Sequence, residues 1–146
     1  RSLSMANKHL KNEIQCVPLK KDDFKTLQFA IGLNKQLTDM AMNQKISDYI
    51  KTVWDLINIS NKFFNENEPW KIVKSDIKQF NKILFITAEL IKIIAIYIYP
   101  IMPQTSEKIF NFLNLNKNDI TIRYLKVEEK HNYKLNSIEP LFPRIN

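Results

Sequence analysis

The sequence predicts an all-α fold, a bundle of about five helices with an extended C-terminal tail packed back on it. Three observations carry this prediction. The 146 residues include a single glycine, which disfavours tight hairpins and glycine-rich phosphate loops. Hydrophobic residues, 45% of the chain, recur at three- and four-residue steps, the spacing of one helix face. Prolines stand between the periodic stretches, where helices end.

The first two helices are predicted over residues 1–10 and about 22–42. The first has three apolar residues at helical spacing, Leu3, Ala6 and Leu10. It is interpreted as the end of a helix whose beginning precedes the sequence. Residues 11–21 show no clear period and form a connecting loop. Asp22 and Asp23 offer a side-chain cap and favourable charge at the start of the second helix.

A third helix follows Asn43 and carries the most regular apolar stripe: Ile46, Tyr49, Ile50, Val53, Trp54, Ile57, Asn61 and Phe64. Trp54 lies within this stripe and is expected in the core. Asn61 is its one amide, and because an unpaired buried amide is costly, we expect it to bond a neighbouring backbone or side chain as a structural group. Pro69 lacks an amide proton and ends this helix within residues 66–68.

A fourth helix is predicted from a cap at Ser75 and Asp76 to Tyr99. Its apolar residues go nearly all the way round, so a membrane-spanning helix must be weighed. Glu89 and Lys92 interrupt the apolar run near its centre, and the part beyond Lys92 is too short to span about 30 Å of hydrocarbon. We therefore predict a buried central helix, with these two charges adjacent on one polar strip.

A short fifth helix is predicted from Pro103 to Leu113, and an extended tail follows it. Three residues of this tail alternate as in a strand: Ile120, Ile122 and Tyr124. The terminal residues 141–145, Leu-Phe-Pro-Arg-Ile, are expected to pack back on the bundle through their apolar side chains.

Chemistry-bearing residues are sparse. His9 and His131 lack partners at zinc-ligand spacing and are interpreted as surface residues, so no metal site is predicted. Cys16 is the single cysteine, which excludes an internal disulfide, fits a reducing compartment and is interpreted as a half-buried apolar residue. The start resembles no signal peptide, and we expect a cytoplasmic protein. The net charge of +7 suits a polyanionic partner, but a biased base composition of the gene would produce it too.

Trp70 has the strongest case for a binding role, although an aromatic anchor closing the bundle is the alternative. Pro69 stiffens the turn before it, and Asn61 and Asn65 offer amide groups one and two turns back. Four lysines surround this corner with positive charge: Lys62, Lys71, Lys74 and Lys78. An exposed indole beside amides and lysines is typical of sites that hold unpaired RNA bases. Residue by residue, the sequence thus predicts a binding or structural domain.

The chain also resembles a known family over essentially its whole length. Residues 61–71, Asn-Lys-Phe-Phe-Asn-Glu-Asn-Glu-Pro-Trp-Lys, are similar to the Ala-Asn-(Arg/Lys)-Tyr-Ile/Val…Glu-x-x-Pro-Trp segment of methionyl-tRNA synthetase anticodon-binding domains of bacterial type. Residues 1–8, Arg-Ser-Leu-Ser-Met-Ala-Asn-Lys, resemble that family's Arg-Thr-Leu-Ser-Phe/Met-x-Asn-Lys. The Tyr-Pro-Ile-Met-Pro of residues 99–103 and the closing Leu-Phe-Pro-Arg-Ile match two further motifs.

The resemblance implies a helical bundle of class I synthetase type that recognises the CAU anticodon loop of methionine tRNA. It implies that Trp70 stacks on an anticodon base, that Pro69 shapes this platform and that Arg1 helps to read the bases. Lys62, Lys71 and Lys74 are the expected contacts to the RNA backbone. A catalytic domain, absent from these residues, would ligate methionine to its tRNA with ATP and magnesium, so neither a catalytic residue nor a cofactor is expected in this part.

The match to this family has two departures, and three different functions compete with it. Phe63-Phe64 replaces the family's Tyr-aliphatic pair, a conservative change on a packed face. The family's Phe-Asp-Gly turn after the first helix is here Leu10-Lys-Asn-Glu13, which puts the geometry of that turn in doubt. Related bundles occur in synthetases for isoleucine, valine, leucine and cysteine, so the chain could serve one of these. An appendage that binds tRNA in trans is the second competing function. A helical scaffold whose basic surface reflects gene composition alone is the third.

Overall fold

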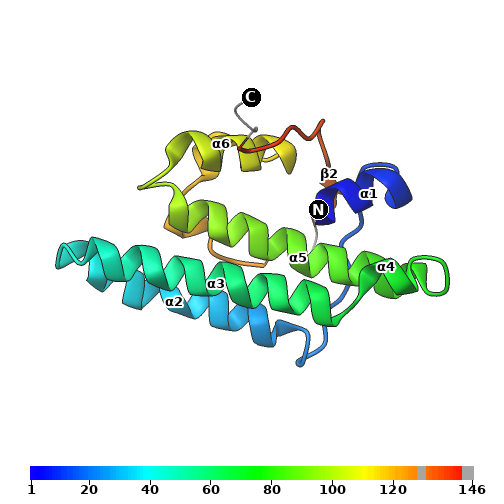
Figure 1. Cartoon of the computed structure of the whole chain (residues 1–146), viewed down its shortest axis with the longest axis horizontal. Helices are drawn as coiled ribbons and strands as arrows, with labels where there is room; N and C mark the ends of the chain where they lie inside the picture. The colour runs from blue at the N-terminus through cyan, green and yellow to red at the C-terminus, as the bar shows by residue number, and fades with distance from the viewer. Residues whose placement is uncertain (128–130, 143–146) are drawn as a thin grey trace.

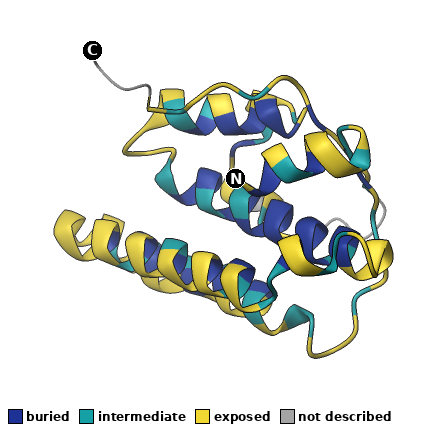
Figure 2. Ribbon diagram, turned by 45° about the vertical axis from the view of Figure 1, so that its right-hand side comes forward, coloured by how far each residue is buried: buried dark blue, intermediate teal, exposed yellow. Residues whose placement is uncertain are grey.

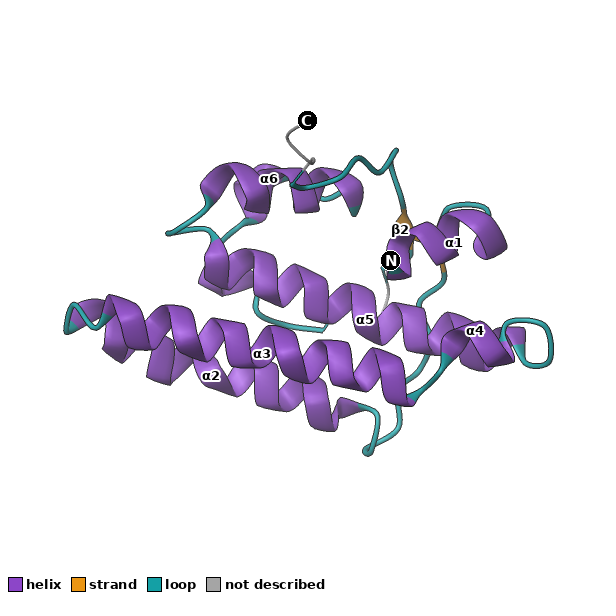
Figure 3. Ribbon diagram, in the orientation of Figure 1, coloured by secondary structure: helices purple, strands orange, loops and turns teal. Residues whose placement is uncertain are grey.

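The computed structural model describes residues 1–127 and 131–142, and this part of the chain is helical throughout its core (Figures 1 and 3). The longer helices are α1 (Ser2–Leu10), α2 (Phe24–Met42), α3 (Ile46–Glu66), α5 (Ile77–Ile98) and α6 (Pro103–Phe112). A single turn, α4 (Pro69–Ile72), joins α3 to α5. Two-residue strands, β1 (Glu13–Ile14) and β2 (Tyr133–Lys134), pair antiparallel. The predicted all-α class is therefore confirmed.

Helix α5 lies at the centre of the molecule, with α2 and α3 on one side and α1 and α6 on the other (Figure 1). One core cluster joins α5 to α1, α6 and the tail, and the second joins it to α2 and α3. Figure 2 shows α5 as the most continuously buried helix. The predicted buried central helix is confirmed, and among the described residues every helix is too short or too polar to cross a membrane.

The two charges of α5 form a buried ion pair. Lys92 Nζ lies 2.8 Å from Glu89 Oε2, and it also donates to the carbonyl of Lys126 at 2.9 Å. The hydroxyl of Tyr133 donates to the other carboxylate oxygen of Glu89. The charges are adjacent as predicted, but they lie inside the core, where the returning tail supplies the polar partners that burial demands.

The predicted helix caps have different outcomes. Asp76 Oδ1 accepts a hydrogen bond from the amide of Gln79 at 3.0 Å and caps α5 as predicted. Asp23 precedes α2, but the predicted side-chain cap is wrong. Its carboxylate accepts from the amide of Lys20 at 2.7 Å and pairs with Lys82 at 2.8 Å, which ties the loop to α5. Burial alone would raise the pKa of Asp23, but these contacts outweigh it and lower that pKa.

The strand-like alternation of residues 120–124 does not correspond to a strand, and the expected extended tail is replaced here by helical turns. Two short 3-10 helices, Lys117–Asp119 and Ile122–Tyr124, occupy this region, because the tail packs against helices and meets no sheet edge there. The predicted return of the tail is confirmed for residues 131–136: Tyr133 and Leu135 are buried, and the amide of Leu135 donates to the carbonyl of Asn12. Of the terminal motif, Leu141 is half-buried, but Phe142 is 68% exposed, so the predicted packing of that ring on the bundle is wrong. Residues 143–145 lie outside the described residues.

Helix α3 contradicts two further predictions. Its buried face is formed by Tyr49, Val53, Leu56, Ser60 and Phe64, which pack toward α2 and α5. Trp54 is not a core residue, because 62% of it is exposed. Asn61 is also exposed and needs no protein partner, since water can satisfy its amide. The predicted stripe was wider than the surface that α2 and α5 cover.

Candidate nucleic-acid interface

The turn from α3 to α4 sets the position of Trp70. Glu68 adopts a left-handed backbone conformation with φ of 41°, which costs a residue other than glycine roughly 1–2 kcal/mol. Pro69 disfavours right-handed helix at the preceding residue and is itself well suited to the first position of α4. The Glu68 carboxylate also meets Lys71 Nζ at 2.7 Å. The buried Pro69 thus begins a new helix in a new direction and places Trp70 at the outer corner.

The indole of Trp70 is partly an anchor and partly a platform. Its ring centroid lies 6.2 Å from that of Phe64, with the planes tilted by 59°. Phe64 is buried, so it forms a rigid support that ties Trp70 to the core. However, 38% of Trp70 remains exposed. Both interpretations of this residue therefore describe part of it, and the exposed part is available to a ligand.

Arg1 reaches this corner from the start of α1. Its guanidinium carbon lies 4.9 Å from the Trp70 ring centroid and 5.8 Å from that of Phe64, both within cation–π range. Arg1 Nη1 also donates to Asn65 Oδ1 at 3.4 Å. The fold therefore gathers the three predicted anticodon residues, Arg1, Pro69 and Trp70, into one cluster. It adds Asn65 as the side chain that holds the guanidinium.

The predicted phosphate-binding lysines lie on the surface around this cluster. Lys62 meets Glu66 at 3.7 Å, and Lys71 pairs with Glu68 as described above. Lys74 is exposed in the turn after α4. Surface ion pairs contribute little, typically about 0–1 kcal/mol, so these lysines can exchange a carboxylate partner for a phosphate. All three lysines are exposed, and Lys71 and Lys74 lie within four residues of Trp70 in the chain.

A large apolar groove adjoins the cluster, and sequence reasoning missed it. Its volume is about 1070 Å³. It opens between α3, α5 and α6, with the start of α1 and the tail at its edges. Its apolar walls are formed mainly by Ile50, Trp54, Ile57, Ile91, Ile94, Ile98, Ile101 and Met102. The signal in the sequence was the wide stripe of α3 and the nearly all-round apolar surface of α5.

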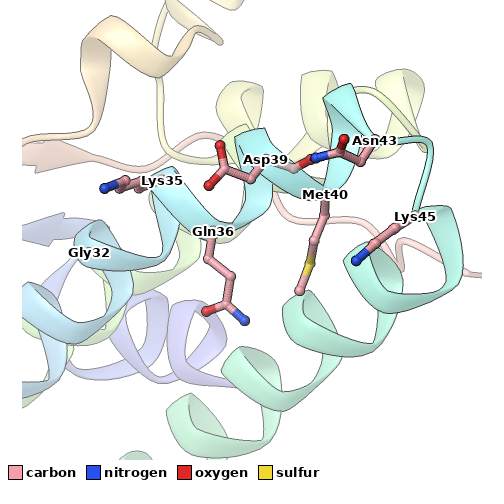
Figure 4. A pocket seen from close by; sticks show the side chains of 7 residues that line it. All are labelled: Gly32, Lys35, Gln36, Asp39, Met40, Asn43 and Lys45. Atoms are coloured by element: carbon pink, nitrogen blue, oxygen red, sulfur yellow. The ribbon is translucent and has the colours of Figure 1, made fainter.

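A second hollow, of about 410 Å³, lies where α2 turns into α3, at the end of α3 away from Trp70 (Figures 1 and 4). It is lined by Gly32, Lys35, Gln36, Asp39, Met40, Asn43 and Lys45. Figure 4 shows Gln36 and Met40 reaching toward α3. Its described lining offers no aromatic ring on which a base could stack, so it lacks the combination found at Trp70.

Of the remaining candidates, His9 is exposed, as predicted, whereas His131 and Cys16 are half-buried. His9 lies edge-on to Phe80 with the ring centroids 5.8 Å apart, and His131 contacts Tyr133 at 5.2 Å. Cys16 is half-buried as predicted. Within residues 1–127 and 131–142, no group of three or more histidine, cysteine or acidic side chains could hold a metal ion.

The comparison with known families decides the classification. Residues 20–137, more than half of the chain, match the family described as the anticodon binding domain of methionyl tRNA ligase. The chain belongs to this family. Methionine–tRNA ligase of Korarchaeum cryptofilum is 27% identical over 99% of the chain, and that of Clostridium acetobutylicum is 28% identical over 100%. These matches cover only 26% and 23% of the two ligases.

Solved structures of the family agree with the fold. Free methionyl-tRNA synthetase of Mycobacterium tuberculosis superposes with a TM-score of 0.90, at 26% identity over 99% of this chain and 30% of that one. The same enzyme bound by methionyl-adenylate gives 0.89 over 97% of the chain. The chain thus spans about a quarter to a third of the length of these synthetases.

Proposed function

We propose that this chain is the anticodon-binding domain of a cytoplasmic methionine–tRNA ligase and that it binds the CAU anticodon loop of methionine tRNA. Another domain of the longer ligase, outside residues 1–146, joins methionine to the tRNA using ATP and magnesium. The observation that carries the proposal is the exposed cluster of Arg1, Asn65 and Trp70 in a chain of this family.

In this proposal Trp70 supplies the stacking surface. Its exposed indole offers a π face to an unpaired base, and stacking of one base on such a ring contributes about 1–3 kcal/mol. Phe64 and Pro69 keep the ring in place, so little freedom is lost on binding. The sequence of the loop is not read by stacking, because every base has a π face.

Arg1 supplies hydrogen-bond donors beside that surface. A guanidinium has five N–H donors in a planar fork, which suits base-edge acceptors and phosphate oxygens. In the free protein it lies over Trp70 and is held by Asn65. A base that stacks on Trp70 replaces the guanidinium over the ring. The guanidinium then lies at the edge of the base.

The lysines supply affinity that depends on salt. Lys62, Lys71 and Lys74 lie close enough to the corner in the chain and on the surface to meet phosphates of the loop. Each phosphate neutralised releases condensed counterions, so binding should weaken as salt rises. These phosphate contacts would be independent of the RNA sequence, which leaves discrimination between anticodons to base-edge contacts such as those proposed for Arg1.

Substitution of the two tryptophans tests the proposal. Trp70→Ala should weaken binding of a methionine tRNA anticodon stem-loop by about 1–3 kcal/mol, roughly 5- to 150-fold. Trp54→Ala is the matched control, because it removes another exposed indole from the same bundle. Affinity is measured by fluorescence anisotropy of a labelled stem-loop, with helicity followed by circular dichroism. Equal losses for both variants, or unfolding of Trp70→Ala, would contradict the site.

A stem-loop with an altered anticodon separates this function from its competitors. The proposed domain should bind the CAU loop more tightly than the altered loop, and Arg1→Ala should reduce this preference. A basic helical scaffold should bind both loops alike. A related domain of another class I synthetase should prefer a different anticodon.

A further inference from the structure

Asn81, on α5, holds both backbone groups of Gln15, a residue 66 positions earlier in the chain. The amide of Gln15 donates to Asn81 Oδ1 at 3.0 Å, and Asn81 Nδ2 donates to the carbonyl of Gln15 at 2.8 Å. A side-chain amide carries the same donor and acceptor as a peptide group, so Asn81 pairs with Gln15 as a neighbouring strand would. An ionised carboxylate could accept but not donate, and an aliphatic side chain could do neither. The buried Asn81 is thus matched to this one backbone site.

This contact fixes the C-terminal end of α1 on α5. Gln15 directly follows β1, and β1 follows the turn that ends α1. In the last turn of α1, the ring of His9 lies edge-on to Phe80, with the centroids 5.8 Å apart. Phe80 and Asn81 are consecutive residues of α5. One place on α5 therefore holds both the end of α1 and the strand that comes after it.

The opposite end of α1 carries Arg1, whose own contacts are long. Arg1 Nη1 donates to Asn65 Oδ1 at 3.4 Å, beyond the usual range of about 2.7–3.2 Å for such a bond. Helix α1 has nine residues, so its ends are about 14 Å apart. A tilt of about 10° at the fixed end would move the other end by roughly 2 Å, enough to break so long a hydrogen bond. The direction of α1 therefore decides whether Arg1 lies over Trp70.

The start of α5 also sets the position of Trp70. The amides of Ser75 and Asp76 donate to the carbonyl of Ile72 at 3.1 and 2.8 Å, which closes a tight turn between α4 and α5. Both α1 and α4 pack on α5 (Figure 1). The two halves of the Trp70 cluster, the guanidinium from α1 and the indole from α4, are thus held from the same helix.

We propose that Asn81 is a positioning residue for anticodon recognition: through Gln15 and β1 it sets the direction of α1 and so holds the Arg1 guanidinium beside Trp70. This inference rests on the proposed function, because it takes the Trp70 cluster as the anticodon site. Asn81 does not meet the RNA, since it is buried and bonded to Gln15. The apolar face of α1 stays in the core when Asn81 is replaced, so α1 should tilt without detaching.

Asn81→Leu tests the proposal in the longer ligase, with Tyr49→Phe as the matched control. Asn81→Leu keeps a branched side chain and removes both hydrogen bonds. Tyr49→Phe removes a buried hydrogen bond to the carbonyl of Tyr97, which joins α3 to α5 in the second core cluster. Asn81→Leu should weaken binding of the CAU stem-loop by about 3- to 10-fold, the factor usual for one lost contact. It should also reduce the preference over an altered loop, and Tyr49→Phe should change neither quantity.

Fluorescence anisotropy of the labelled stem-loop measures these affinities, and circular dichroism checks that the variants stay helical. Equal losses of affinity in Asn81→Leu and Tyr49→Phe overturn the proposal, because general loosening of the bundle would then explain both.

Arg1→Ala separates positioning from general support of the fold. If Asn81 acts through Arg1, adding Asn81→Leu to Arg1→Ala should change the affinity by less than about twofold, because the group that Asn81 positions is gone. Losses of affinity that multiply in the double variant overturn the proposal, since Asn81 would then act independently of Arg1.

A fluorine label on Trp70 reports on the Arg1 contact without RNA. Fluorotryptophan is placed at position 70 alone, and its 19F resonance is recorded in the longer ligase. Arg1→Ala should shift this resonance, because a cation leaves the face of the ring. Asn81→Leu should shift it in the same direction, and Tyr49→Phe should leave it in place. An unshifted resonance in Asn81→Leu overturns the proposal.

Asn81→Asp is the second variant, for the case that Asn81→Leu does not fold. It keeps the acceptor for the Gln15 amide and loses only the donor to the Gln15 carbonyl. It should give a smaller loss of affinity and a smaller shift of the resonance in the same direction. A resonance that stays in place in this variant also overturns the proposal.

The fluorine readout distinguishes this inference from the proposed function. A shift in Asn81→Leu, together with stem-loop binding that does not depend on Trp70, would contradict the proposed anticodon recognition and leave Asn81 as the residue that positions Arg1. Stem-loop binding that requires Trp70 and Arg1, together with an unshifted resonance in Asn81→Leu, would contradict the positioning role alone.

Discussion

Two exposed tryptophans on neighbouring parts of the fold have opposite surroundings. Trp70 is 38% exposed and has an aromatic support in Phe64, a guanidinium over its ring and lysines nearby. Trp54 is more exposed, at 62%, yet it lies on the wall of an apolar groove with almost no charge. The comparison teaches that exposure alone does not distinguish the ring proposed to bind RNA from a ring on an apolar wall. The charge and support around the ring do.

Removing Phe64, the ring that supports Trp70, should have the largest effect, and this effect is on stability. Phe64→Ala should lower the free energy of unfolding by about 3–5 kcal/mol, because it leaves a cavity under Trp70 and between α3 and the core. Trp54→Ala should change the same quantity far less, since most of that ring is in water. Urea denaturation followed by circular dichroism measures both. Equal losses of unfolding free energy in Phe64→Ala and Trp54→Ala would show that these two rings are buried alike. The distinction between the supported corner at Trp70 and the groove wall at Trp54 would then fail.

Replacing Asn65, the hydrogen-bond partner of the Arg1 guanidinium, should have a smaller effect, and on RNA affinity instead of stability. Asn65→Ala should weaken stem-loop binding by about 0.5–1.5 kcal/mol, the usual contribution of one hydrogen bond, because Arg1 loses the contact that holds it over Trp70. Asn61→Ala is the matched control, an exposed amide one turn earlier on α3 that makes no hydrogen bond to Arg1 in the described structure. Isothermal titration would compare the two. A loss in Asn61→Ala as large as in Asn65→Ala would mean that either amide serves.

Much of this architecture follows from local signals in the sequence. Apolar spacing and the prolines predict the long helices, because helix ends depend on a few residues near each end. The Pro69–Trp70 pair predicts an aromatic at a helix exit for the same reason. The capping role of Asp76 is also local and is confirmed.

What the sequence could not predict depends on which elements meet in space. Trp54 has the spacing of a core residue, but its exposure depends on what covers α3 beyond α2 and α5. Glu89 and Lys92 are one turn apart, yet their burial depends on Tyr133 and Lys126 arriving from the tail. The Arg1–Trp70 contact likewise joins distant parts of the chain. The family resemblance suggested that these two residues share a site, and the structure supplied their distance.

The central claim is that a base stacks on Trp70, and the fluorescence of that indole tests it most directly. In Trp54→Phe, Trp70 is the one remaining tryptophan of the 146 residues. Titration with the CAU stem-loop should quench its emission, with a midpoint equal to the dissociation constant measured by anisotropy. Trp70→Phe, which reports on Trp54, should bind more weakly and show no such quenching. Quenching of Trp54 with unchanged Trp70 emission would contradict the account, because it would place the RNA in the groove.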